Sequence, residues 1–210
     1  MNIIIFGSTG GTGVQLIKQA LEKGYSVSAF ARNPEKILLK HEKLKVIKGD
    51  VLNLQSVEKA IQNHDAVLCS IGLSSIMDKS NLRAKGIKNI IQAMQDSGIN
   101  RLICQSALGV SESYNLLPFF YKFLIVPLFM KHLYSDHELQ ETYIKVSKLK
   151  WTIIRPAVLT NNELTRKYQH GTKKGNKSIT AKISRADTAD FMLEQLINES
   201  YFCQTPYVSY

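Results

Sequence analysis

A glycine-rich turn close to the N-terminus has the residue types and spacing that bind phosphate. Residues 7–13 read Gly-Ser-Thr-Gly-Gly-Thr-Gly and follow an apolar run, residues 3–6, that predicts a buried strand. The spacing of Val14, Ile17 and Leu21 predicts a helix directly after the turn. Glycines let the backbone approach a pyrophosphate, and free N–H groups at a helix start point toward its negative charge. The predicted dinucleotide-binding turn consists of Gly7, Thr9, Gly10, Gly11, Thr12 and Gly13.

The residues after the second predicted strand indicate the type of cofactor. An NAD-binding fold places an Asp or Glu there, about 20 residues after the glycines, to bind the ribose. In this chain Arg32 takes that place, with Lys36 one turn further on. A guanidinium suits the 2′-phosphate of NADP, because it forms paired hydrogen bonds with charged oxygens. We therefore expect NADPH to be preferred over NADH, with Glu35 as an alternative ligand for the ribose.

Further cofactor contacts are expected where two other strands end. Asp50 and Val51 follow the third predicted strand and are placed to flank the adenine. Ser70, Ile71 and Gly72 follow the fourth and are placed to line the cofactor beneath its central ribose. These assignments rest on strand ends alone, so an ordinary turn is the alternative for each residue.

The elements that must hold these residues alternate between strand and helix. Strands are predicted at residues 3–6, 26–30, 44–47, 66–70, 102–105 and 151–155, with helical patterns between them, the last over 136–147. Such alternation favours right-handed β-α-β units and a parallel sheet. A chain of 210 residues fits one core. We predict one α/β domain over residues 1–210, a Rossmann-like doubly wound parallel sheet with strand order 3-2-1-4-5-6.

Charge and cysteine content indicate which partners and which cellular location to expect. The formal net charge is +10, without a nucleic-acid motif, so we expect no nucleic-acid partner. The charge indicates either a solvated basic face or attraction of an anionic cofactor and substrate. Cys69 and Cys104 fall in apolar strand-like runs, which predicts buried free thiols rather than a disulfide or a metal site. With no signal peptide visible, we expect a cytoplasmic protein.

Residues 116–130 are the most apolar stretch of the chain. Lys122 and two prolines interrupt it, and it is too short for a membrane span, so we expect no integral membrane association. Core or loop packing is one explanation, and a hydrophobic wall or lid over a flat substrate is another. Peripheral membrane contact is a third. We expect the substrate pocket to be formed by segments 107–135 and 157–180.

Several segments together resemble a known group of proteins. They are Gly7-x-x-Gly10-x-x-Gly13, Ala-Arg-Asn-Pro-Glu-Lys at 31–36, Gly-Asp-Val at 49–51, Cys-Gln-Ser-Ala at 104–107, Leu-Lys-Trp-Thr-Ile-Ile-Arg-Pro at 149–156 and Ser-Arg-Ala-Asp at 184–187. Over nearly its whole length the chain resembles the atypical short-chain dehydrogenases of the NmrA-like NAD(P)H-binding group, closest in form to the biliverdin-IXβ reductase/flavin reductase type. The resemblance implies a Rossmann-like fold, NADPH, and hydride transfer to flavins or other flat conjugated acceptors.

The resemblance also implies roles for individual residues. Ser106 matches a serine beside the nicotinamide that orients donor and acceptor, with a turn-capping serine as the alternative. Pro156 matches a proline that packs near the nicotinamide. His137 matches a histidine that could assist protonation near its titration midpoint at neutral pH, with a surface histidine as the alternative. A second histidine of the reductase is Val158 here, which puts biliverdin itself in doubt.

No tyrosine of the chain is followed four residues later by lysine. The Tyr-x-x-x-Lys pair serves alcohol–ketone chemistry, which is therefore disfavoured. We predict an NADPH-dependent reductase of a flavin, quinone or tetrapyrrole-like acceptor, with Ser106 and His137 as catalytic residues and no metal. The alternative is a non-catalytic NADP-binding redox sensor of the NmrA type that acts through a protein partner. We expect a monomer or weak dimer.

Overall fold

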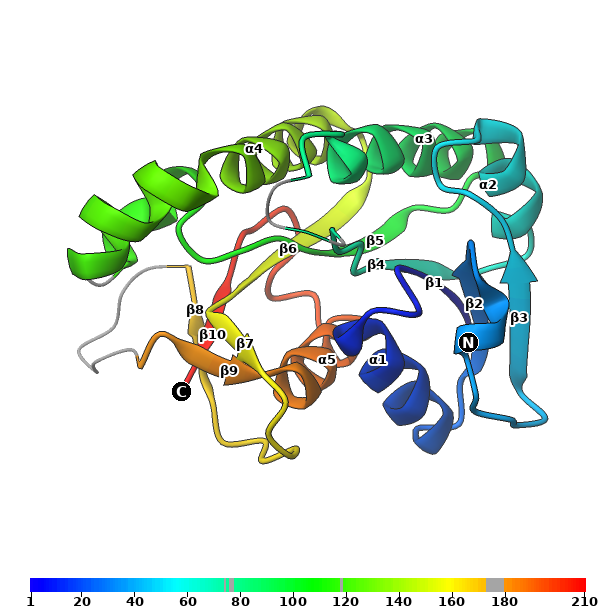
Figure 1. The fold of residues 1–210 in the computed structure, drawn as a ribbon. Helices are drawn as coiled ribbons and strands as arrows, with labels where there is room; N and C mark the ends of the chain where they lie inside the picture. The colour runs from blue at the N-terminus through cyan, green and yellow to red at the C-terminus, as the bar shows by residue number, and fades with distance from the viewer. Residues whose placement is uncertain (74, 76–77, 118, 173–179) are drawn as a thin grey trace.

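One large sheet forms the centre of the fold. The computed structural model describes residues 1–73, 75, 78–117, 119–172 and 180–210. Eight strands form the sheet in the order β3-β2-β1-β4-β5-β6-β10-β8 (Figure 1). Strands β1 to β6 pair in parallel, which confirms the predicted single α/β domain with strand order 3-2-1-4-5-6.

The observed strands start and end within about a residue of the predicted ones. The first six are β1 (Asn2–Phe6), β2 (Ser26–Ala31), β3 (Leu44–Lys48), β4 (Ala66–Cys69), β5 (Arg101–Gln105) and β6 (Lys150–Pro156). Short strands not predicted from the sequence are β7 (Val158–Thr160), β8 (Gln169–Gly171), β9 (Lys182–Ser184) and β10 (Tyr207–Ser209). β10 extends the sheet in parallel beside β6, β8 is antiparallel to β10, and β7 pairs with β9.

The helices cover the two faces of this sheet (Figure 1). On one face lie α2 (Leu54–Ile61), α3 (Leu82–Ser97) and α4 (Lys131–Val146), and on the other α1 (Gly11–Glu22) and α5 (Arg185–Glu194). Successive side chains of a strand point to opposite faces. Ile4 and Phe6 of β1 therefore pack in one hydrophobic cluster, and Ile3 and Ile5 in a second. Burial on both faces explains why the central strands read as continuous apolar runs.

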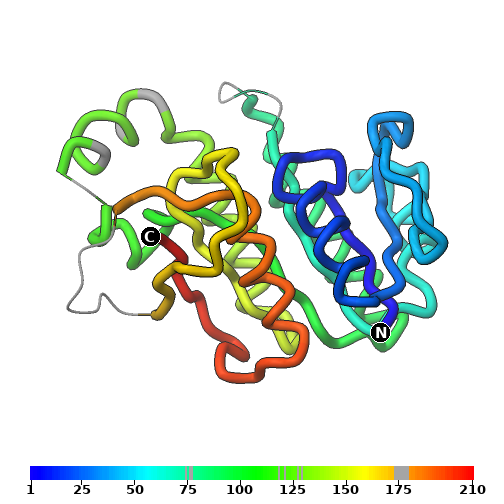
Figure 2. The backbone as a smooth tube through the Cα atoms, turned by 90° about the horizontal axis from the view of Figure 1, so that it is seen from below, coloured from blue at the N-terminus to red at the C-terminus, as the bar shows by residue number. Residues whose placement is uncertain are grey.

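The apolar segment 116–130 continues directly into α4. Its regular parts are a 3-10 turn, η2 (Ser111–Leu116), and a π-helix, η3 (Tyr121–Met130). Val126 is buried, but four large side chains face solvent: Phe119 is 79%, Leu128 65%, Phe123 60% and Phe120 58% exposed. Core packing is therefore wrong for these four. Figure 2 shows this segment on the same side of the molecule as the chain after β6, away from β3.

The start of α1 packs tightly against the glycine-rich turn. A Cβ atom on Gly13 would lie 2.2 Å from the carbonyl oxygen of Gly7 and 2.8 Å from the Cα of Ser8. Gly72 has no heavy atom within 4 Å of its Cβ position outside its chain neighbours. The first position therefore excludes any larger residue, whereas the second tolerates one.

We expect Gly13→Ala to lower the free energy of unfolding by about 1–3 kcal/mol, because the added methyl forces the backbone of the turn to move. Gly72→Ala is the control and should change the unfolding free energy by less than about 0.5 kcal/mol. Urea unfolding of both variants checks this. Equal midpoints in the two variants would contradict the packing argument.

Candidate active site

Two cavities adjoin at the carboxyl ends of the central strands. The smaller has a volume of about 230 Å³ and the larger about 590 Å³. Both are lined by Gly10 and by residues 71–73, so they lie side by side across the loop after β4. The strand order reverses between β1 and β4. Ligands of doubly wound sheets bind at this reversal, beyond the carboxyl ends of the strands.

The glycine-rich turn lines both cavities. Gly7 has a φ of +80°, and a Cβ atom on it would lie 2.5 Å from the carbonyl carbon of Ser70. Gly10 is the N-cap residue before α1 and provides no side-chain cap, and the first helical turn holds no acidic residue. The positive end of the helix dipole is therefore available to an anion. A backbone without Cβ atoms and with open N–H groups fits the diphosphate of a dinucleotide.

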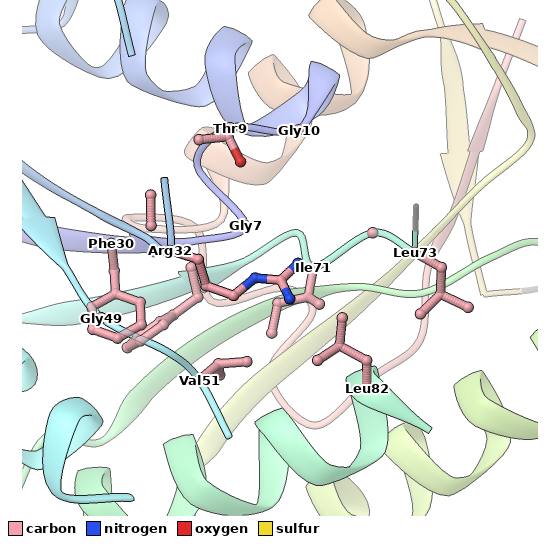
Figure 3. A pocket seen from close by; sticks show the side chains of 13 residues that line it. Gly7, Thr9, Gly10, Phe30, Arg32, Gly49, Val51, Ile71, Leu73 and Leu82 are labelled. Carbon is pink, nitrogen blue, oxygen red and sulfur yellow. The ribbon is translucent and has the colours of Figure 1, made fainter. Parts of the chain in front are cut away.

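The smaller cavity brings Arg32 and Val51 together with this turn. Figure 3 shows the guanidinium of Arg32 reaching across the cavity toward Ile71. Phe30 and Gly49 form another part of the wall, where a Cβ atom on Gly49 would lie 2.4 Å from the Phe30 ring. The cavity is thus an apolar slot with a cation at one edge.

Three of the predicted cofactor residues lie outside both cavities. Lys36 is exposed on the short turn Pro34–Lys36, as is Glu35. Asp50 accepts a hydrogen bond from the Leu52 N–H at 2.9 Å, which folds the loop after β3. Gly13 contacts the glycine-rich turn itself.

The larger cavity collects the residues predicted near the reacting groups. It is lined by Ser70, Ile71, Gly72, Ser106, His137 and Pro156 among others. The remaining wall is mostly apolar and includes Leu73, Leu108, Leu117, Met130, Leu133 and Ala157. Its lining therefore draws on both segments that were expected to form the substrate pocket, together with the loop after β4.

A buried ion-pair network holds Ser106. Its hydroxyl donates to Glu141 Oε1 at 2.8 Å rather than to a turn backbone. Arg155 donates to both oxygens of the same carboxylate, at 2.8 and 2.6 Å. Burial raises the pKa of Glu141, but hydrogen bonds from Arg155 and the charge of that guanidinium lower it below its ordinary value. Because the Ser106 proton is engaged with a carboxylate, its oxygen is left to accept a hydrogen bond from a ligand.

His137 is buried, so the surface alternative is wrong. Burial and, next, the charge of Arg83 lower the pKa of His137 to about 3, although a hydrogen bond with Gln140 opposes this. The expectation of a titration midpoint near neutral pH is therefore also wrong. A protonated imidazole is too costly in this desolvated position beside a cation. The neutral ring lines the larger cavity.

Sequence reasoning missed Arg83 and Arg185, which both line the larger cavity. Arg83 stands at helical spacing from Ile87, Ile90 and Met94, which are all buried. A charged residue within an apolar stripe of a helix was the available signal. Arg185 lay within the Ser-Arg-Ala-Asp segment of the resemblance, but only its position at the start of α5 brings it over the glycine-rich turn.

Cys69 and Cys104 are buried, free and paired in register on β4 and β5, as expected. Across the described residues, no group of three His, Cys, Asp or Glu side chains is arranged to hold a metal ion. Nor does any helix within the described residues have the length and apolar character needed to cross a bilayer.

The lowered pKa of His137 makes a prediction for stability. Between about pH 3 and 6.5 the unfolded chain binds a proton at this residue and the folded protein does not. This contribution to stability is therefore present above pH 6.5 and is lost as the pH falls, by about 2 kcal/mol at pH 5. His137→Gln should flatten that part of the stability profile in urea unfolding from pH 7 to 4.5. His132→Gln, at an exposed site on the same helix, should keep the slope of the unmodified protein.

The chain is similar in sequence to proteins of other organisms. YwnB of Bacillus subtilis is 26% identical over 209 residues, 93% of this chain and 92% of its own. The photosystem II assembly factor Ycf39 of Synechocystis is 28% identical over 116 residues, 53% of this chain. The matched part spans 35% of Ycf39, so that relative is much longer than the region it shares.

Three solved structures share the fold. The oxidoreductase ylbE of Lactococcus lactis has a TM-score of 0.84 at 22% identity, covering 100% of this chain and 90% of its own. A Veillonella parvula short-chain dehydrogenase/reductase in complex with NADP has a TM-score of 0.83 at 18% identity, covering 100% and 94%. ChuY, an anaerobilin reductase of Escherichia coli, has a TM-score of 0.79 at 20% identity, covering 100% and 97%.

The model of a protein family matches most of the chain. The match extends over residues 7–199, from the first glycine of the turn to beyond α5. It therefore includes all the lining residues of the larger cavity and six of the eight strands of the sheet, but not β1 and β10. The chain belongs to the NAD(P)H-binding family.

Proposed function

We propose that this protein is an NADPH-dependent reductase that transfers hydride to a flavin or another planar conjugated acceptor. The observation that carries the proposal is the larger cavity, which adjoins the glycine-rich turn, is mostly apolar and has Ser106 in its wall. Bound NADPH would supply a hydride, and the acceptor would take it up with a proton from solvent. The similarity to a solved anaerobilin reductase supports a planar acceptor.

The side chains around the cavity favour an acceptor that needs no dedicated proton donor. Tyr134 is the tyrosine among the lining residues, and its hydroxyl donates to the Leu108 carbonyl at 2.9 Å. Its fourth following residue is Glu138 rather than lysine. His137 is neutral, and Ser106 is bonded to Glu141. Reduction of a flavin or quinone suits this site, since water can protonate the product.

A redox sensor without turnover is the second candidate, favoured by four exposed apolar side chains, those of Phe119, Phe120, Phe123 and Leu128. Such a surface can serve as a contact for a protein partner. NADPH oxidation measured with FMN, riboflavin, quinones and linear tetrapyrroles separates the two. Steady oxidation with any of them supports the reductase. NADPH binding without oxidation by the whole panel would favour the sensor.

We expect Arg32→Ala to remove most of the preference for NADPH over NADH while leaving NADH affinity nearly unchanged. The guanidinium at the edge of the smaller cavity is the group that would bind the 2′-phosphate, and charge-assisted hydrogen bonds contribute about 1.5–3 kcal/mol each. Calorimetric titration with both cofactors measures this. Lys45→Ala, which removes a charge from β3, is the control. Equal affinity of the unmodified protein for the two cofactors would refute the assignment.

We expect Ser106→Ala to lower turnover by roughly tenfold to a hundredfold, because a fixed hydroxyl that positions the reacting groups is lost. NADPH affinity should change little, since the diphosphate contacts lie at the glycine-rich turn. Single-turnover kinetics with the best acceptor of the panel measures the effect. Ser97→Ala, whose hydroxyl bonds its own helix at 2.7 Å, is the matched control. An unchanged rate in Ser106→Ala would remove this residue from the mechanism.

A further inference from the structure

Within the described part of the chain, the charges that line the larger cavity are all of one sign. The charged lining residues there are Arg83 and Arg185, with no Asp or Glu among them. The two arginines come from opposite faces of the sheet, Arg83 from the start of α3 and Arg185 from the start of α5. An apolar cavity with a cation on each side favours a ligand that carries negative charge.

Arg185 lies on the cofactor side of this cavity. Its Cδ is 2.5 Å from the Cβ position of Gly11, so the side chain crosses the glycine-rich turn. Its Nη1 donates to Asn161 at 2.7 Å and to the Leu159 carbonyl at 3.4 Å, which keeps it over that turn. We therefore associate Arg185 with the diphosphate.

Arg83 lies on the other side, beside His137, and its guanidinium is incompletely paired. The residue is only 6% exposed. Its Nη1 contacts Asp136 Oδ2 at 3.3 Å, and its Nε has no hydrogen-bond partner among the described residues. Asp136 is shared, because it also accepts the backbone N–H groups of Arg83 at 3.2 Å and Ala84 at 3.0 Å. This carboxylate caps α3 and leaves much of the cation uncompensated.

A buried guanidinium with one long contact is costly unless something else binds it. Four neighbouring groups respond to its charge: Arg83 contributes to the lowered pKa of His137, of Asp78 and of Cys69, and it opposes the raised pKa of Cys104. Asp78 is half-buried and does not line the cavity. An oxyanion on a bound molecule is the partner that the guanidinium lacks, because Arg matches carboxylate and phosphate geometry.

We propose that Arg83 binds a carboxylate or phosphate group carried by the acceptor, so that the protein selects anionic planar molecules over neutral ones. The identification of the ligand as the acceptor rests on the proposed function. The binding of an aromatic oxyanion to Arg83 does not, and it can be measured without any turnover.

The test uses three naphthalene probes that differ in one substituent: 2-naphthoate, 2-naphthyl phosphate and the neutral 2-naphthamide. Each is titrated calorimetrically into the protein saturated with NADP. We expect at least one of the anions to bind roughly tenfold or more tightly than the amide. The stronger of the two identifies carboxylate or phosphate as the preferred group. In Arg83→Met the difference between anion and amide should disappear, and in Arg83→Lys part of it should return.

Two controls separate this role from others. Lys85→Met removes the same charge from an exposed site on α3 and should leave all three affinities unchanged. Arg83→Met should bind NADP as tightly as the unmodified protein, and its circular dichroism and unfolding midpoint report whether it folds. If Arg83→Met does not fold, the Arg83→Lys protein and the probe preference of the unmodified protein still decide.

Two results would overturn the proposal. One is equal binding of anions and amide by the unmodified protein. The other is a loss of NADP affinity in Arg83→Met as large as the loss for the anions, which would assign the guanidinium to the cofactor. Failure of the proposed function has a different signature, namely anion-selective probe binding without NADPH oxidation by any acceptor. With turnover present, the ratio of kcat/KM for FMN to that for riboflavin should fall in Arg83→Met.

Discussion

The structure around the candidate active site, at the carboxyl ends of the strands, depends on the ion pair between Arg155 and Glu141. Both side chains are 1% exposed, and their Nη2 and Oε2 atoms are 2.6 Å apart. Removing two charges from water costs several kcal/mol per ion unless hydrogen bonds compensate. Here the compensation comes from Ser106, Lys145 and Glu112. Arg155 belongs to β6 and Glu141 to α4, so the pair holds that helix against the sheet. Ser106, which directly follows β5, is held in place by its hydrogen bond to the same carboxylate.

The helix α4 thereby organises the side of the cavity away from the glycine-rich turn. Its buried face consists of Asp136, His137, Gln140, Glu141 and Ile144, four of which are polar. A polar stripe at helical spacing is tolerated inside a protein only when its members are hydrogen-bonded. Each carboxylate of this stripe faces an arginine from another element, Arg83 on α3 or Arg155 on β6. One helix thus sets both the direction of the Ser106 hydroxyl and the surroundings of Arg83.

The sequence predicted the sheet and its order because each central strand is an apolar run buried on both faces, a local pattern. It also brought Arg32 and the glycine-rich turn to one cavity, because the position of each follows from the strand that precedes it. His137 could not be placed in this way, because its burial depends on α3 packing against α4. The burial of Arg83 could not be predicted for the same reason, because Asp136, which pairs with it, lies 53 residues further along the chain. The exposure of Phe119, Phe120, Phe123 and Leu128 could not be predicted either, because apolar composition does not show which residues pack against a side chain.

The division of the hydrophobic interior into two clusters has a mechanical consequence. One cluster joins α2, α3 and α4 to the sheet, and the other joins α1 and α5 to its opposite face. The layers share the strands but have separate side-chain interiors, and the larger cavity takes lining residues from helices of both. A molecule bound between the start of α1 and the start of α3 would contact both layers at the carboxyl ends of the strands. It would reduce the motion of one layer relative to the other, because the strands between the two layers are what connects them.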